Sequence, residues 1–313
     1  MIRLMKYLSC WVVTWALLTS SLDALAQDRT QRKAIQDSPL AYALFNAEGE
    51  PQSWGQIMDA VATADVVCFG ELHDDAIMHW LQAEMVRDLL DRGLQPALGA
   101  EMLEADDQLI LDEFLTGIAN EDKFKAAANL WPNHFTDYHP LLELAKEHQL
   151  KVVATNVPRR YASLVYREGL EGLAQLSDDA KAYLPPLPIP FDADLPGYQA
   201  MMAMGGGHAG ETLPMAQAIK DATMAHFISS HLPADAPFIH FNGAYHSQDW
   251  EGIVWYLKGA LPELNVLTLH GTTQNQVLEP DSAALNRGDF LLITHERITV
   301  SYTHLTLPTI LLV

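Results

Sequence analysis

The chain has 313 residues, of which 49% are hydrophobic and 19% charged, a balance that excludes disordered, collagen-like and coiled-coil proteins. Its formal net charge of −21 at pH 7 comes from 40 acidic residues against 19 Lys and Arg. This acidity argues against sequence-independent binding of nucleic acid or anionic membranes, because phosphate groups require a basic surface. Two cysteines are too few for a disulfide framework or a cysteine-rich zinc site.

The N-terminus has the pattern of a secretory signal peptide. Arg3 and Lys6 precede an apolar run at 11–22, and the motif Ala24-Leu25-Ala26 follows it. We therefore expect a Sec signal peptide over residues 1–26, cleaved after Ala26, and a periplasmic mature protein. An uncleaved anchor is the less favoured alternative, because the apolar run is short for a membrane span.

Composition also sets the limits of the expected domain. Residues 27–54 are expected to form an N-terminal extension and residues 55–300 the folded domain. Residues 301–313 are uncharged and mostly apolar; they resemble translated adaptor sequence, so we expect an artefactual tail and exclude it from the functional argument. Cys10 precedes the apolar run, whereas a lipoprotein cysteine would follow it, so lipid attachment is not predicted. Association with the outer membrane is left open.

Short apolar runs alternate with helical stretches along this domain. The runs are nearly continuous, as in strands of a parallel sheet that is covered on both faces; they are Val66–Gly70, Ala97–Met102, Val152–Val157, Phe238–Asn242, Val266–His270 and Phe290–Thr294. Helical periodicity predicts helices at Ala76–Arg92, Gln108–Leu115, Pro140–His148 and Leu213–His231. For the first helix, Asp74 and Asp75 are candidate N-caps and Gly93 a stop signal. The alternation predicts an α/β fold with right-handed crossovers.

An insertion is expected at about 185–235, between two strands. It opens with a proline-rich stretch that cannot form a regular helix, and continues with methionines at 201, 202 and 204 beside three glycines. Methionine and glycine give a soft, adaptable apolar surface. We interpret the insertion as a lid that faces a ligand.

Polar residues lie at or just after the ends of four of the predicted strands. They are Glu71 and His73, Glu101, Asn156 and His246. Because the carboxyl ends of parallel strands lie along one edge of a sheet, where ligands bind, these side chains are expected to converge. No local periodicity explains this coincidence, so it is the most informative feature of the sequence.

The chemistry of this cluster leaves alternatives open. Histidines and carboxylates without thiolates suit zinc, manganese or iron, with Glu71, His73, Glu101 and His246 as the ligands. The same side chains could work as a general base and its orienting partner. The structural alternative is that Glu71 accepts backbone hydrogen bonds and His73 caps the following helix.

Further candidates surround the cluster. His79 lies on the inward face of the first predicted helix, either as a supporting residue or as a core histidine. Gln217 and Asp221 share a helix face and are expected to make polar contacts. His208 ends the Met/Gly segment and is a plausible haem ligand. The chain has no G-x-S-x-G, H-E-x-x-H or Walker A motif, and no C-x-x-C-H, so any haem would be b-type and held non-covalently.

Five blocks in chain order resemble the ChaN-like family of haem-binding uptake proteins, which belongs with the Tiki/TraB and erythromycin-esterase-like proteins. The blocks are CFGELHDDAIMHWLQAEMVRDLL, GAEMLEADDQ, ATNVPRRYASLVYREGL, AQAIKDATMAHFI and FNGAYHSQDWEG, and the resemblance covers roughly residues 55 to 270. Its fold implies a three-layer α/β/α sandwich with a central, mainly parallel sheet and a helical lid insertion. Glu71, His73, Glu101, Asn156 and His246 match the superfamily's cleft motif.

The resemblance also implies a ligand and a partner. It implies haem held between the two subunits of a homodimer through tyrosine and histidine, with His208, Tyr198 and Tyr245 as the candidates by position. His208, Gln217 and Asp221 match the block of the lid helix. A role in haem or iron uptake implies an outer-membrane haem or siderophore receptor as a partner.

Two functions from different classes therefore compete. The first is an exported haem or iron carrier, in which the lid covers the porphyrin. The second is a hydrolase, dependent on a divalent metal or on histidine, that uses the strand-end cluster to activate water. We favour the first, although the cluster itself suits hydrolysis better than haem ligation.

Overall fold

The apolar runs form a seven-stranded sheet in the computed structural model, which describes residues 40–204 and 212–298. The strands are β1 (Tyr42–Asn46), β2 (Val66–Glu71), β3 (Ala97–Glu104), β4 (Val152–Asn156), β5 (Phe238–Gly243), β6 (Val266–Gln274) and β7 (Phe290–His295). Their order is β1-β7-β6-β2-β5-β3-β4. The pairs from β7 to β4 are parallel, and β1 runs antiparallel to β7 at one edge. The mainly parallel sheet expected from the sequence is confirmed.

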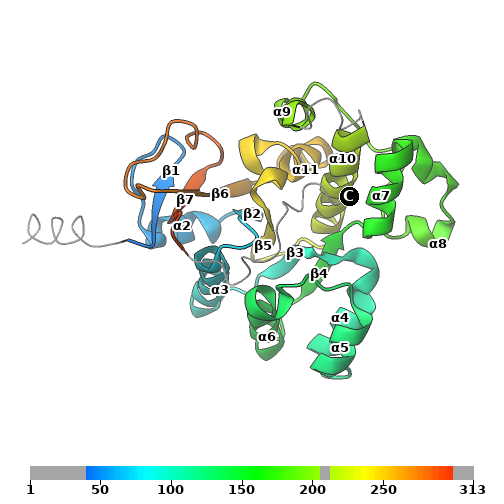
Figure 1. Cartoon of the computed structure of the whole chain (residues 1–313). Helices are drawn as coiled ribbons and strands as arrows, with labels where there is room; N and C mark the ends of the chain where they lie inside the picture. Colours follow the sequence, from blue (N-terminus) through cyan, green and yellow to red (C-terminus); the bar gives the residue numbers. More distant parts are fainter. Residues whose placement is uncertain (1–39, 205–211, 299–313) are drawn as a thin grey trace, which may run out of the picture. The chain divides into compact units, whose positions relative to one another are not determined.

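Alternate residues of each central strand enter opposite hydrophobic cores, because successive side chains point to opposite faces. On β2, Val67 and Phe69 belong to the first core, and Val66 and Cys68 to the second. The first core is closed by α2 (Trp54–Val61), α3 (Ala76–Asp91), α4 (Gln108–Leu115), α5 (Glu121–Ala127) and α6 (His139–Glu147). The second is closed by α7 (Arg159–Glu168), α10 (Thr212–Ser229) and α11 (Ile253–Ala260). Figure 1 shows these two helix sets on opposite sides of the sheet, so the three-layer α/β/α fold is confirmed.

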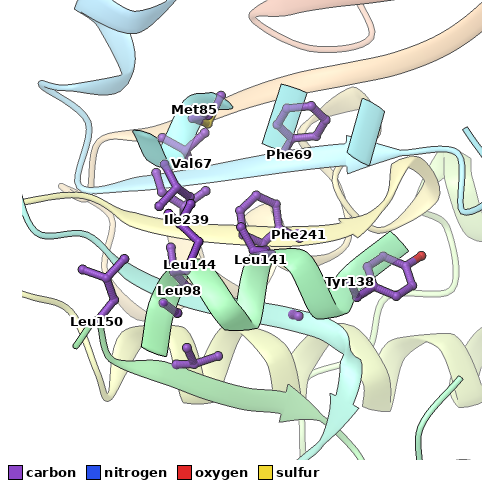
Figure 2. Close-up of a cluster of buried hydrophobic side chains, with 14 of the residues drawn as sticks. Val67, Phe69, Met85, Leu98, Tyr138, Leu141, Leu144, Leu150, Ile239 and Phe241 are labelled. Atoms are coloured by element: carbon purple, nitrogen blue, oxygen red, sulfur yellow. The ribbon is translucent and has the colours of Figure 1, made fainter. Parts of the chain in front are cut away.

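The first core is rich in leucine and aromatic side chains (Figure 2). Tyr138 lies at one end of it, and its hydroxyl points away from the leucines of α6. Tyr138 closes a short π-helix, η2 (His134–Tyr138), directly before α6. Such an irregularity often marks a functional site.

The four expected helices are present, with ends within two residues of the prediction. Asp75 caps α3, and its Oδ1 accepts hydrogen bonds from the amides of Ile77 at 2.9 Å and Met78 at 3.1 Å. Gly93 follows the helix at φ +80°, a conformation that glycine adopts without strain. Both local signals were therefore interpreted correctly.

Two domain limits need correction. Residues 42–46 of the expected N-terminal extension form β1, because they pair with β7, and the folded unit therefore begins at Tyr42. Within the expected insertion, α10 is a helix of the second layer, since eleven of its residues are buried. The prediction of a lid therefore concerns only the stretch before α10, which includes α9 (Pro196–Met204). The short helix α8 (Asp178–Lys181) precedes this stretch.

Some predictions lie outside the described residues. These are the signal peptide over 1–26, the tail over 301–313, and His208 within 205–211. Among the helices in the described ranges, none is both long and apolar enough to cross a membrane.

Candidate functional site

The C-terminal edge of the sheet gathers the five predicted strand-end residues. Glu71 ends β2, Asn156 ends β4, and Glu101 lies in β3. His73 follows β2 by two residues, and His246 lies in the short 3-10 helix η4 (Ala244–His246) directly after β5. Since β2, β5, β3 and β4 are parallel neighbours, their ends meet at one edge.

An irregularity in β3 lies at Glu101. The pairing of β3 with β4 shifts between Ala100 and Glu104, as in a β-bulge. Within this stretch, Glu101 Oε2 accepts a hydrogen bond from the amide of Gly243 on β5 at 2.7 Å. The side-chain amide of Asn156 donates to the Glu101 carbonyl oxygen at 2.8 Å. Asn156 therefore supports the backbone of the bulge, and Glu101 reaches across to β5.

Glu71 is a fully buried carboxylate surrounded by donors. Its Oε1 accepts from His73 Nδ1 at 2.9 Å and from the Tyr138 hydroxyl at 2.7 Å. Its Oε2 accepts from the Gln82 side chain and lies 3.4 Å from His79 Nε2. Burial alone would raise the pKa of Glu71, but the bonds from His73 and His79 outweigh it and lower the pKa to about 2. Glu71 is therefore ionised, and its carboxylate accepts three hydrogen bonds from within the protein.

His246 lies between two buried carboxylates. Its Nδ1 lies 2.5 Å from Asp221 Oδ1, and its Nε2 lies 3.1 Å from Glu101 Oε1. Burial would lower the pKa of His246, but the negative charges of Glu101 and Asp221 raise it to about 10. Both ring nitrogens therefore carry protons and donate. The side-chain amide nitrogen of Gln217 lies beside the ring, 3.0 Å from His246 Nδ1, but two donors do not bond each other, so it is not a partner of the doubly protonated ring.

His73 joins the two halves of the cluster. Nδ1 bonds Glu71, and Nε2 lies 4.0 Å from Glu101 Oε2. Its side chain is 32% exposed, whereas those of Glu71, Glu101 and His246 are buried, so His73 is the member of this group that reaches the surface. Burial opposes protonation, but the bond to Glu71 raises the pKa of His73 overall. The edge of the His73 ring meets Trp131, with the ring centroids 4.8 Å apart.

Gly243 makes room for His73. A Cβ atom at this position would lie 2.7 Å from His73 Nε2 and 3.4 Å from Glu101 Oε2, closer than the imidazole tolerates. The glycine therefore lets β5 approach the imidazole closely.

The supporting residues predicted from sequence contact the cluster at both ends. His79 is buried between Glu71 and Asp137 Oδ2, which lies 3.8 Å from its Nδ1. Asp221 meets His246 from α10, and its second oxygen accepts from the Tyr198 hydroxyl at 3.3 Å. Imidazoles and carboxylates thus alternate from the first core, across the sheet edge, to the second layer.

Four contributing residues were missed in the sequence: Gln82, Trp131, Asn133 and Tyr138. Gln82 follows His79 by three positions on α3, so the inward face of that helix was a usable signal. Tyr138 lies 67 positions from Glu71, in a π-helix without a sequence signature. Asn133 donates to the His73 carbonyl oxygen at 2.9 Å, again across a long separation.

The structure places the residues predicted to bind a metal or haem in different surroundings. In the described parts of the chain, no group of three or more His, Cys, Asp and Glu side chains is arranged to hold a metal ion. Of the two candidate tyrosines, Tyr198 is 4% exposed and its hydroxyl is bonded to Asp221, whereas Tyr245 is 49% exposed beside His246. A haem iron needs an accessible ligand atom, which favours the exposed Tyr245 over the buried Tyr198, and both assignments stay predictions.

Comparisons with known proteins agree with this architecture. The backbone resembles ChaN of Campylobacter jejuni, whose structure is described as showing cofacial haem binding, with a TM-score of 0.62 and 16% identity over 81% of this chain and 96% of that one. A mutant of the erythromycin esterase EreC in its open conformation gives a TM-score of 0.45 at 13% identity, covering 82% of this chain and 83% of that one. The chloroplastic protein RETICULATA-RELATED 5 of Arabidopsis thaliana is 24% identical over 199 residues, which are 58% of this chain and 26% of that protein. The chain thus spans about a quarter of that relative.

A family model decides the assignment. The model described as "Haem-binding uptake, Tiki superfamily, ChaN" matches residues 57–257, which include every cluster residue from Glu71 to His246. The chain therefore belongs to the ChaN family of haem-binding uptake proteins within the Tiki superfamily.

Proposed function

We propose that this protein binds b-type haem non-covalently and serves in haem or iron uptake. The observation that carries the proposal is the match to the haem-binding uptake family over residues 57–257. This function is favoured over the hydrolase alternative, which stays a prediction.

Tyr245 is the proposed iron ligand. It follows β5 at the sheet edge, and its half-exposed side chain would offer a phenolate oxygen to the iron of a haem that arrives from solvent. Bound haem would supply a ferric iron, a Lewis acid that tyrosine can ligate. The chain's own part is to present this side chain from a short helix whose neighbour, His246, is tied to Glu101 and Asp221.

Export and assembly are further parts of the proposal. The signal-peptide pattern supports a periplasmic location. A homodimer with haem between its subunits is the assembly that the family resemblance implies, and it is part of this proposal. An outer-membrane haem or siderophore receptor would then be the partner in uptake.

Haemin titration tests the binding. Haemin added to the purified chain is expected to give a saturable shift of the Soret band in the low micromolar range. Tyr245→Phe should weaken binding by about tenfold, or ~1.4 kcal/mol, and remove the tyrosinate-to-iron charge-transfer band. Tyr42→Phe is the matched control, because that partly exposed tyrosine lies on the edge strand β1, away from the site, and should leave the spectrum unchanged.

Each other outcome has a definite meaning. A shift no larger than that of an unrelated acidic protein would overturn haem binding. Full affinity and an intact charge-transfer band in Tyr245→Phe would overturn the ligand assignment, and a loss in His208→Ala would move it to His208. Sedimentation with and without haemin separately tests the dimer, which should form only with haemin.

A further inference from the structure

The helix α9 is attached to the rest of the fold by few contacts. Among residues 196–203, Tyr198 alone is buried. Its ring stacks on Phe191 with the centroids 5.6 Å apart, and its hydroxyl donates to Asp221 Oδ2. An element held by so little buried surface belongs to the least stable part of a structure.

A second carboxylate holds the start of α9. The amide of Gly197, in the first turn, donates to Glu251 Oε2 at 2.7 Å. A Cβ atom at Gly197 would lie 2.5 Å from that oxygen, so the close contact depends on glycine. A negative charge at a helix N-terminus is also favourable, since the helix dipole is positive there. We call the two contacts, Tyr198 with Asp221 and Gly197 with Glu251, the α9 clasp.

Asp221 belongs both to the α9 clasp and to the strand-end cluster. One oxygen accepts from Tyr198 and the other from His246, while the opposite nitrogen of His246 bonds Glu101. The carboxylate is 1% exposed, so water cannot replace a lost partner. In such a buried network, the strength of one hydrogen bond depends on its neighbours.

We infer that the docking of α9 is coupled to the strand-end cluster through the shared carboxylate of Asp221. A ligand or substitution that disturbs His246 changes the stability of docked α9. By linkage, release of α9 changes the surroundings of His246 to the same extent in free energy. The docked and released forms of α9 are the two states that the coupling requires.

Hydrogen exchange on the full chain, without haemin, tests the inference. Tyr198→Phe keeps the ring and removes the hydroxyl, so amides of residues 198–204 should exchange about fivefold faster. His246→Gln should also accelerate exchange in α9, by about threefold, although the polar contacts of His246 within the described residues are with Glu101, Asp221 and Gln217 and not with that helix. His79→Gln is the matched control, because His79 is a buried imidazole of the same cluster that does not contact Asp221; it should leave α9 unchanged.

Double variants separate coupling from general loosening. Tyr198→Phe with His246→Gln should exchange more slowly than the product of the single effects predicts, whereas Tyr198→Phe with His79→Gln should match that product. Parent-level exchange of α9 in His246→Gln, or equal acceleration in His79→Gln, would overturn the coupling.

A variant outside the strand-end cluster tests the reverse effect, that of α9 release on His246. Glu251→Ala opens the other contact of the clasp without touching Asp221. It should accelerate exchange in α9 and shift the NMR resonance of the His246 Nδ1 proton, and an unmoved resonance with released α9 would contradict the inference. Because no step uses haem, failure here would leave the haemin titration, and the proposed function, standing.

Discussion

At the scale of single residues, Glu71 and Glu101 are two buried carboxylates with different hydrogen-bond partners. Glu71 accepts hydrogen bonds from His73, Tyr138 and Gln82, so it acts as an anchor that orients His73. Glu101 accepts from Gly243 and His246 and still has an oxygen 4.0 Å from His73 Nε2. Glu101 therefore accepts fewer hydrogen bonds than Glu71 and has more acceptor capacity left for a ligand.

The raised pKa of His246 predicts a loss of stability at alkaline pH. Its stabilisation is fully present below the unfolded value of 6.5 and is lost as pH rises through the folded value of about 10. Denaturant unfolding between pH 6 and 10 should show His246→Gln less stable by about 3–5 kcal/mol at pH 6, with the difference from the parent shrinking toward pH 10.

A second buried histidine provides the control. Burial, with the nearby charge of His139, lowers the pKa of His134 to about 4, so His134 is neutral throughout this range. The pH dependence of His134→Phe above pH 6 should therefore follow that of the parent. An unchanged pH dependence in His246→Gln would contradict the assignment of an imidazolium.

At the scale of elements, one side chain closes the exposed edge of the sheet. Gln108, at the start of α4, accepts from the amide of Ala154 at 2.7 Å and donates to the carbonyl oxygen of Val152 at 3.0 Å. These are the two bonds that a further strand beside β4 would make. An unprotected edge would invite pairing with another chain, so Gln108 acts as an edge guard.

Removing this guard should destabilise β4 and promote association. Gln108→Ala should lower the free energy of unfolding by about 1–2 kcal/mol, since two backbone groups lose their partners. Gln108→Glu keeps an acceptor for Ala154 but has no donor for Val152, so about half that loss is expected. Chemical denaturation and light scattering measure the two effects, and equal stability of Gln108→Ala and the parent would rule out this role.

At the scale of the whole molecule, two hydrophobic cores share one sheet. Ile239 lies in the first core on β5, and Ile219 lies in the second on α10; both are fully buried. The same strands supply side chains to both cores, so neither helix layer can keep its core without the shared sheet. Tyr42–Asn46 adds an antiparallel edge to the same sheet, so we expect the folded unit to unfold in one transition.

A pair of conservative substitutions tests this unity. Ile239→Val and Ile219→Val should each cost about 0.5–1.5 kcal/mol, and the double variant should cost their sum, because the side chains lie on opposite faces. Each should also lower the midpoint of one shared transition in calorimetry and circular dichroism. Two transitions that respond separately to the two variants would show independent layers.

Local patterns predicted most of the architecture but not its edge. Val66–Glu71 and the other buried strands were recognised because a strand covered on both faces leaves a continuous apolar run. Tyr42–Asn46 was missed because it is a short edge strand without such a run. The proline-rich start of the insertion was clear from sequence, whereas the place of α10 in the second layer depended on what its apolar residues contact.

The sequence by itself determined that Glu71, His73, Glu101, Asn156 and His246 would share one edge, because the carboxyl ends of parallel strands lie along the same edge in any strand order. Only the tertiary structure decided which partners each of these side chains has. The saturation of Glu71 by Tyr138, the bulge at Glu101 and the sharing of Asp221 by His246 and Tyr198 all join residues far apart in the chain. Such contacts depend on the packing of several elements at once, and no spacing in a single stretch of sequence encodes them.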